Sequence, residues 1–93
     1  MTINLEIKIN PEYVSLIPEL SSTEYEMLKE SIKDNGQQIP IYVDEYGNIL
    51  DGHNRYRACL EVGFEPKFEV KRFARESYKK KTVIYMNLHR RQL

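Results

Sequence analysis

A short polar run, Asp51-Gly52-His53-Asn54-Arg55, follows an apolar strand-like pair and opens a segment with helical spacing. The first amides of a helix have no acceptor within the helix, and the helix dipole makes them partly positive. Gly52 lets an anion approach the backbone because no Cβ stands in the way. Arg55 can hold a phosphate through two hydrogen bonds, and His53 and Asn54 add donors on the same turn. The run therefore predicts a phosphate site, although many helices begin in this way and bind no ligand.

The other residues with reactive side chains are interpreted structurally. No second His or Cys lies at metal-ligand spacing from His53, so no metal site is expected. Cys59 lies between Ala58 and Leu60 of the same predicted helix, which favours a buried structural thiol. The run Lys79–Lys81 is interpreted as a solvated helix face, with contact to a DNA backbone as the alternative.

The aromatic residues are mostly tyrosines, of which the chain has seven. We interpret four of them as residues of the core or its edge: Tyr13, Tyr25, Tyr42 and Tyr85. Along the linear sequence, basic and aromatic residues do not alternate in the way that single-stranded nucleic acid binding requires. The aromatic content therefore predicts packing, with Tyr56 as the one tyrosine expected near the phosphate site.

The elements that must position this site follow from hydrophobic periodicity and turn residues. The helix before the site is capped by Ser22 or Ser21, and Asn35-Gly36 ends it. The predicted elements are a strand at 5–9, an irregular stretch at 14–20, a helix at 22–34, strands at 39–43 and 49–50, a helix at 52–63, a strand at 66–73 and a helix at 75–89. The order β-α-β-β-α-β-α indicates an α+β (mixed α/β) domain with a small sheet and three helices.

Composition limits the classes of function. The 93 residues suffice for a single domain, and no run is long and apolar enough for a membrane span or a secretory signal. A single cysteine is consistent with a reducing cytoplasm. Residues 1–50 carry three Lys/Arg and nine Asp/Glu, a net of −6, whereas residues 51–93 carry eleven and five, a net of +6. The basic half suggests an anionic ligand, unless the two halves fold together and their charges mix on the surface.

Four motifs in order resemble the ParB/sulfiredoxin superfamily, over residues 7 to 92. The run Asp51–Ala58 resembles its glycine-arginine signature, in the D-G-x-N-R form of phage and plasmid proteins. Residues 28–41 resemble its L-x-x-S-I-x-x-x-G…P-I segment, and Ile9-Asn10-Pro11 resembles the preceding I-x-x-N-P. Asn87–Arg91 resembles the closing E-N-x-x-R motif. The resemblance implies a ParB/sulfiredoxin-like fold, as in ParB N-terminal (ParB-like nuclease) domains.

The resemblance also implies a ligand and partners. It places contacts to a nucleoside triphosphate, CTP with Mg²⁺ in ParB proteins, on the Gly52–Arg55 turn and on Asn87 and Arg90. It implies association with DNA through a C-terminal region beyond residue 93, a homodimer, and a cytoplasmic domain that is the N-terminal part of a longer partition, plasmid or phage protein. Two positions depart from the motifs. Asn54 replaces an arginine, and Met86 stands where the motif has a glutamate that suits Mg²⁺ better than a thioether does.

Enzymatic readings of the same motifs remain open. Nucleoside triphosphate hydrolysis is one, and the superfamily also includes nucleases and free-serine kinases. The kinases use D-G-H-x-R, which Asp51–Arg55 resembles, with an acidic base near the position of Glu19. The catalytic candidates are therefore Glu19, Asp51 and His53. Sulfiredoxin activity is not expected, because the catalytic cysteine of that enzyme would fall at His53.

Overall fold

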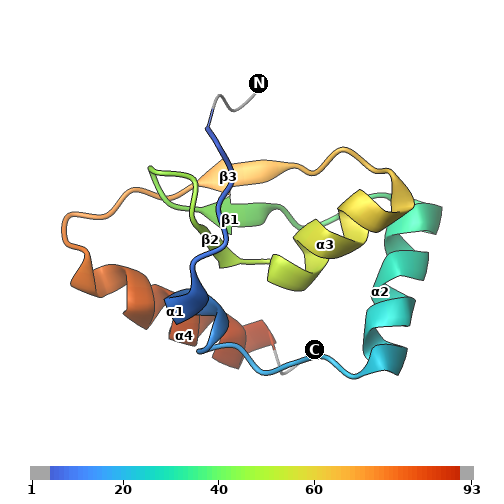
Figure 1. The fold of residues 1–93 in the computed structure, drawn as a ribbon, viewed down its shortest axis with the longest axis horizontal. Helices are drawn as coiled ribbons and strands as arrows, with labels where there is room; N and C mark the ends of the chain where they lie inside the picture. Colours follow the sequence, from blue (N-terminus) through green and yellow to red (C-terminus); the bar gives the residue numbers. More distant parts are fainter. Residues whose placement is uncertain (1–4, 91–93) are drawn as a thin grey trace.

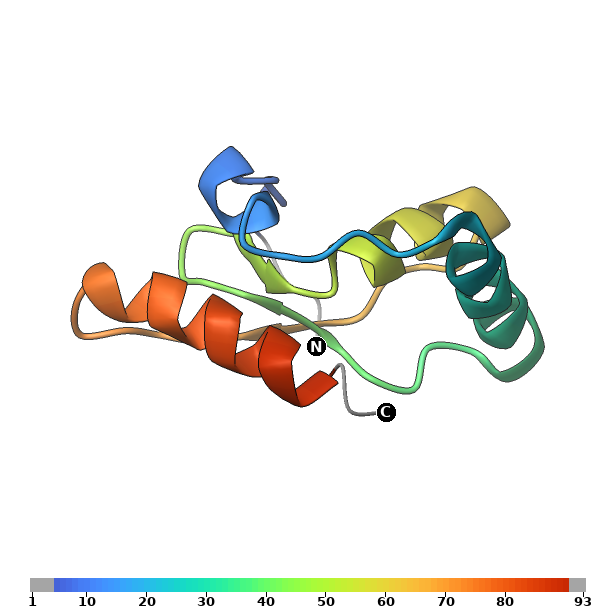
Figure 2. The same ribbon diagram turned by 90° about the horizontal axis from the view of Figure 1, so that it is seen from below.

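The computed structural model describes residues 5–90, and their side chains as far as residue 88. A small three-stranded sheet lies at the centre of the domain (Figure 1). The elements are α1 (Pro11–Val14), α2 (Ser22–Asn35), β1 (Ile41–Val43), β2 (Ile49–Asp51), α3 (His53–Val62), β3 (Phe68–Val70) and α4 (Ser77–Arg90). Both views place α1 and α4 at one end of the sheet and α2 and α3 at the other (Figures 1 and 2).

The sheet has the order β2-β1-β3, with β1 antiparallel to β2 and parallel to β3. The β1–β2 hairpin turns through Gly47, where a Cβ would collide with the backbone oxygen of Glu6. Helix α3 connects β2 to β3, so this connection crosses from one side of β1 to the other. The α+β class is thereby confirmed, and the end of β2 delivers the chain directly into α3.

The core consists of three groups of buried residues. Tyr25 and Ile32 of α2 pack against Ala58 and Cys59 of α3, which confirms Tyr25 as a core residue and Cys59 as a buried thiol. A second group joins α1, β2 and α4: Tyr13, Leu50 and Val83. A third lies within the sheet: Ile41, Val43 and Ile49, covered in part by Tyr56. Helix α3 is therefore packed between α2 and the sheet.

Helix α2 begins and ends as the sequence indicates. The Oγ of Ser21 accepts a hydrogen bond from the Glu24 amide at 3.1 Å, and Glu24 Oε1 accepts one from the Ser21 amide at 2.9 Å. This reciprocal capping box satisfies two orphan donors of the first turn. At the other end Gly36 takes a φ of 77°.

The predicted first strand, Leu5–Ile9, is wrong. Within the described residues this segment meets the sheet through one isolated bridge, between Lys8 and Asn48. A short helix, α1, follows it, and the sequence reading missed that helix. Asn10 is its N-cap, with Oδ1 accepting from the Glu12 amide at 2.9 Å, and proline occupies the first turn. Asn-Pro is a favourable helix start, so this dipeptide begins α1.

Two expectations for α4 are also wrong. Lys79 does not belong to a solvated face, because its side chain is 1% exposed and paired with Asp44. Tyr85, expected in the core or at its edge, is 62% exposed. A helix places residues 79 and 83 on one side and residues 81 and 85 on the opposite side, so the packing of Val83 against the sheet decides both positions.

The two halves of the chain share their charges. Lys80 Nζ lies 2.7 Å from the Glu12 carboxylate, and Lys29 Nζ lies 3.5 Å from that of Glu61. In each pair, one residue comes from positions 1–50 and the other from positions 51–93. Mixing of the charges of the two halves on the surface therefore accounts for part of the charge asymmetry. None of the helices in the described part of the chain is both long and apolar enough to cross a bilayer.

Candidate functional site

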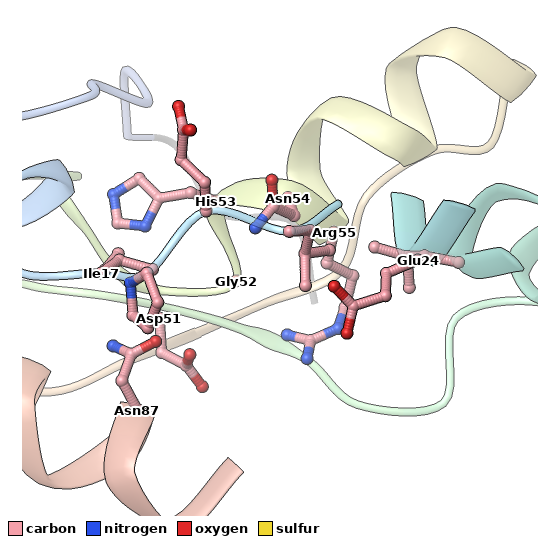
Figure 3. A pocket seen from close by; sticks show the side chains of 12 residues that line it. Ile17, Glu24, Asp51, Gly52, His53, Asn54, Arg55 and Asn87 are labelled. Carbon is pink, nitrogen blue, oxygen red and sulfur yellow. The ribbon is translucent and has the colours of Figure 1, made fainter. Parts of the chain in front are cut away.

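A pocket of about 440 Å³ opens beside the start of α3 (Figure 3). Its walls come from four parts of the fold, which are the loop before α2, the inner face of α2, the β2–α3 junction and the side of α4. The lining residues are Ile17, Pro18, Glu19, Leu20, Glu24, Leu28, Asp51, Gly52, His53, Asn54, Arg55 and Asn87. All four residues of the predicted phosphate turn thus border one cavity.

Gly52 is required for this junction. It is the N-cap of α3 with a φ of 102°, a conformation that side chains rarely adopt. A Cβ at this position would lie 2.7 Å from Nη1 of Arg55 and 3.2 Å from Cγ1 of Ile41. The Gly52 carbonyl accepts the first helical hydrogen bond, from the Tyr56 amide at 2.7 Å. The turn therefore depends on glycine both for its backbone angle and for the space that Arg55 occupies.

The first turn of α3 keeps its electrostatic character. No side chain caps the helix within the described residues. The amides of His53 and Asn54 have no acceptor inside the helix, because they precede the first intrahelical bond. With the helix dipole, they give this wall of the pocket a partly positive potential.

Arg55 is fixed on the pocket wall. Its Nη1 donates to the carbonyl of Pro40 at 3.3 Å, which ties α3 to the start of β1. Across the pocket, the carboxylate of Glu24 points toward the Arg55 guanidinium (Figure 3). A guanidinium carries five donors in a planar fork, so an anion entering here would share Arg55 with these neighbours. Glu24 was not among the site residues predicted from the sequence, and only the fold places it beside the pocket.

His53 has a half-buried side chain at the other side of the pocket. Both of its ring nitrogens are sealed from solvent and have no hydrogen-bond partner in the described part of the structure. Burial lowers the pKa of His53 below its usual value, and the carboxylate of Asp51 offsets only part of this effect. The imidazole is therefore neutral at pH 7, with one donor and one acceptor that the described residues leave unsatisfied.

The catalytic candidates converge on this pocket. Glu19, Asp51 and His53 all line it, and Asp51 is 4% exposed at the end of β2. With Glu24, three carboxylates border the pocket against one guanidinium. Among the side chains that the structure describes, residues 5–88, no three or more His, Cys, Asp or Glu form a cluster with metal-binding geometry.

The two candidates from the last helix have different outcomes. Asn87 lines the pocket, and its Nδ2 donates to the Val83 carbonyl at 2.8 Å, which orients the amide on α4. Arg90 belongs to the last turn of α4, but its side chain lies outside the described residues. The structure thus gathers Glu19, Asp51, the Gly52–Arg55 turn and Asn87 around one cavity.

Comparisons with known proteins bear on the fold. No protein-family model matches the chain. ORF326b, an uncharacterized protein of Acidianus two-tailed virus, is 32% identical over 89 residues, which are 95% of this chain and 27% of that protein. The solved structure of a Pnob8-like ParB-N domain superposes with a TM-score of 0.73 at 24% identity, covering 94% of this chain and 35% of that one. This chain thus spans about a quarter and about a third of the lengths of these two proteins. The superposition over nearly the whole length shows that this chain has the fold of a ParB N-terminal domain.

Proposed function

We propose that this domain binds a nucleoside triphosphate, with CTP as the first candidate, and holds its phosphates at the N-terminus of α3. The observation that carries the proposal is the uncapped first turn, Gly52–Arg55, forming one wall of a pocket of about 440 Å³. Pockets for small ligands typically measure roughly 300–1,000 Å³, so the cavity has a suitable size. Backbone amides and a guanidinium are the donors that phosphate oxygens accept from best.

The charges of the lining residues define how such a ligand would bind. Arg55 and the helix dipole favour an anion, whereas Glu19, Glu24 and Asp51 oppose it. A bare triphosphate is therefore poorly matched, and a divalent cation would compensate the excess of negative charge. Mg²⁺ is commonly held by one or two carboxylates together with the phosphates of the substrate. Asp51 and Glu19 are the residues of this chain that fit that role.

The rest of the pocket suits the nucleoside. Ile17 and Leu28 offer apolar surface, and Asn87 supplies an amide that can both donate and accept. As part of the same proposal, the domain belongs to a DNA-associated ParB-like protein. DNA and a second copy of the chain are the partners that this proposal expects.

A phosphoryl transferase is the second candidate. Glu19, Asp51 and the neutral His53 lie in the same pocket as the proposed phosphate turn. A general base must lie within hydrogen-bond reach of the proton that it removes, so a small hydroxyl substrate beside these groups would be well placed. Incubation with γ-labelled nucleotide and free serine distinguishes the two candidates. Label on serine indicates a kinase, and label in inorganic phosphate indicates hydrolysis. A nucleotide that binds but gives neither labelled product indicates binding alone.

Thermal shift and titration calorimetry with CTP, ATP, GTP and ADP, each with and without Mg²⁺, test the binding proposal. A ligand at a hundred times its dissociation constant stabilises the fold by about 2.7 kcal/mol. Arg55→Ala should weaken binding by roughly 1.5–3 kcal/mol, since a charge-assisted contact is lost.

The matched control is Arg57→Ala, on the same helix. The Arg57 side chain is 62% exposed and does not line the pocket, so this variant should bind nucleotide as the unmodified chain does. The proposal fails if no nucleotide shifts the transition, or if a folded Arg55→Ala variant binds as tightly as Arg57→Ala.

A further inference from the structure

The outer face of α4 carries a line of exposed side chains, two cationic, two aromatic and one aliphatic, which we call the α4 stripe. Its members are Arg75, Tyr78, Lys81, Tyr85 and Leu88. They recur every three or four residues, the spacing that puts side chains on one face of a helix. Arg75 lies just before the helix, and its carbonyl accepts from the Tyr78 amide at 3.1 Å, so it belongs to the same turn. Helical geometry thus creates an alternation that is not apparent in the linear sequence.

The stripe is not explained by packing. The opposite side of α4 faces the domain, where Lys79 and Val83 are 1% and 0% exposed. On the stripe, Tyr78 is 42% exposed, Tyr85 62% and Leu88 61%. Figure 2 shows α4 along the border of the molecule, with no element beyond it. The helix therefore presents aromatic surface to solvent on a face that the core does not use.

The two cations of the stripe lie beside the Tyr78 ring. Arg75 Cζ lies 6.0 Å from the centre of the Tyr78 ring, and Lys81 Nζ lies 5.9 Å from it. The stripe itself contains no carboxylate. The neighbouring carboxylates are engaged elsewhere, with Glu76 2.5 Å from Lys79 Nζ and Glu12 2.7 Å from Lys80 Nζ. This face is therefore positive and aromatic at once.

We propose that the α4 stripe binds single-stranded nucleic acid, with Arg75 and Lys81 at the phosphates and Tyr78 and Tyr85 stacked on bases. Cations that follow a sugar-phosphate backbone and aromatic rings that stack on bases are the combination that single strands require. Paired bases in a duplex do not offer their faces to a side chain, so a duplex would use the cations alone. Tyr78 and Tyr85 are two helical turns apart, about 10 Å along the axis, which gives each ring its own base.

This surface is separate from the nucleotide pocket. Asn87 borders the pocket from another side of α4, and no member of the stripe lines it. The two proposals therefore stand or fall independently. Measuring both nucleotide binding and single-strand binding in Arg55→Ala and in the stripe variants shows which of the two proposals has failed.

Fluorescence anisotropy with labelled oligo-dT and with the corresponding duplex tests the inference. The single strand should bind more tightly, and Tyr85→Ala should weaken it on the order of tenfold, whereas Tyr85→Phe should retain binding because the ring remains. Lys81→Ala should reduce the slope of log affinity against log salt by about 0.7, the value for one phosphate contact to a single strand.

Lys33→Ala is the matched control for charge, because Lys33 is an exposed lysine on α2, at the other end of the sheet. It should leave the salt slope unchanged. Circular dichroism confirms that the stripe variants fold, as expected for exposed positions. Equal binding of duplex and single strand with Tyr85→Ala unaffected overturns the inference. The inference is also overturned if the chain does not bind oligo-dT and the Tyr85→Ala variant loses self-association, since the face would then join two copies.

Discussion

The ammonium group of Lys79 is buried against the carboxylate of Asp44, with Nζ 3.0 Å from Oδ2 and the two side chains 1% and 0% exposed. Asp44 follows β1 directly, and its Oδ1 also accepts from the amides of Tyr46 and Asn48 at 2.9 Å each. One carboxylate thus shapes the β1–β2 turn and holds α4 against it. The position of α4 matters for function, because this helix brings Asn87 to the pocket and turns the α4 stripe outward.

Removing the cation of this pair should be strongly destabilising. In Lys79→Met the Asp44 carboxylate would stay buried without its partner, which typically costs about 3–5 kcal/mol. Urea unfolding measures the loss. The double variant Asp44→Asn/Lys79→Met should recover part of it, because the Asp44 charge is then no longer stranded, while Glu45 and Glu76 still lose the cation that they share with Asp44. Lys80→Met is the control on the same helix, since its pair with Glu12 is exposed and worth at most about 1 kcal/mol. A Lys79→Met variant as stable as Lys80→Met would contradict this account.

Acid should weaken the same pair. Burial alone would raise the pKa of Asp44, but hydrogen bonds from Lys79 and Asn48 outweigh it and hold the pKa below the usual value. A lowered carboxylate pKa gives stability that is present above the unfolded value, near 3.8, and is lost as pH falls through the folded pKa.

In Lys79→Met the Asp44 pKa should rise above its value in the unmodified chain, because the cation that lowers it is gone while burial remains, and protonation relieves the stranded charge. The difference in unfolding free energy between the unmodified chain and Lys79→Met should therefore shrink from pH 7 to pH 3. A constant difference across this range would show that Asp44 and Lys79 are not coupled.

The sequence predicted the parts of the fold that short-range signals determine. Helix α2 depends on the Ser21 and Glu24 capping box, and α3 lies between Gly52 and Gly63, so a few neighbouring residues define each. Most of the candidate residues also line one pocket, because the end of β2, the start of α3 and α4 meet there. Whether those residues bind a nucleotide stays a prediction.

What the sequence reading missed depends on partners far along the chain. Lys79 meets Asp44 across 35 positions, and nothing local distinguishes it from the solvated lysines that follow it. The segment 5–9 has the alternation of a strand, but only one residue of it, Lys8, bridges to the sheet. Glu24 caps α2 through local bonds, and only the folded chain places it opposite Arg55.

The two glycines that bound α3 offer a paired test of the site. Both have a positive φ, 102° for Gly52 and 77° for Gly63, so alanine at either should cost roughly 1–3 kcal/mol of stability. A Cβ at Gly63 would meet nothing within 4 Å, whereas one at Gly52 would displace the Arg55 guanidinium. Gly52→Ala should therefore weaken nucleotide binding in calorimetry, and Gly63→Ala should not. If both variants fold and bind alike, the Gly52–Arg55 contact has no part in binding.

His53 should report directly on an anion in the pocket. Because burial lowers its pKa, the folded chain binds its proton less readily than the unfolded chain does, and stability should decline as pH falls below about 6.5. His53→Gln should abolish this decline. Proton NMR of the two histidines of the chain gives the pKa itself, and His53→Gln assigns its resonance. A phosphate bound beside the ring would favour the imidazolium, so nucleotide should raise the His53 pKa. Nucleotide that binds yet leaves this pKa unchanged would place the phosphates away from His53, toward Arg55 and Glu24.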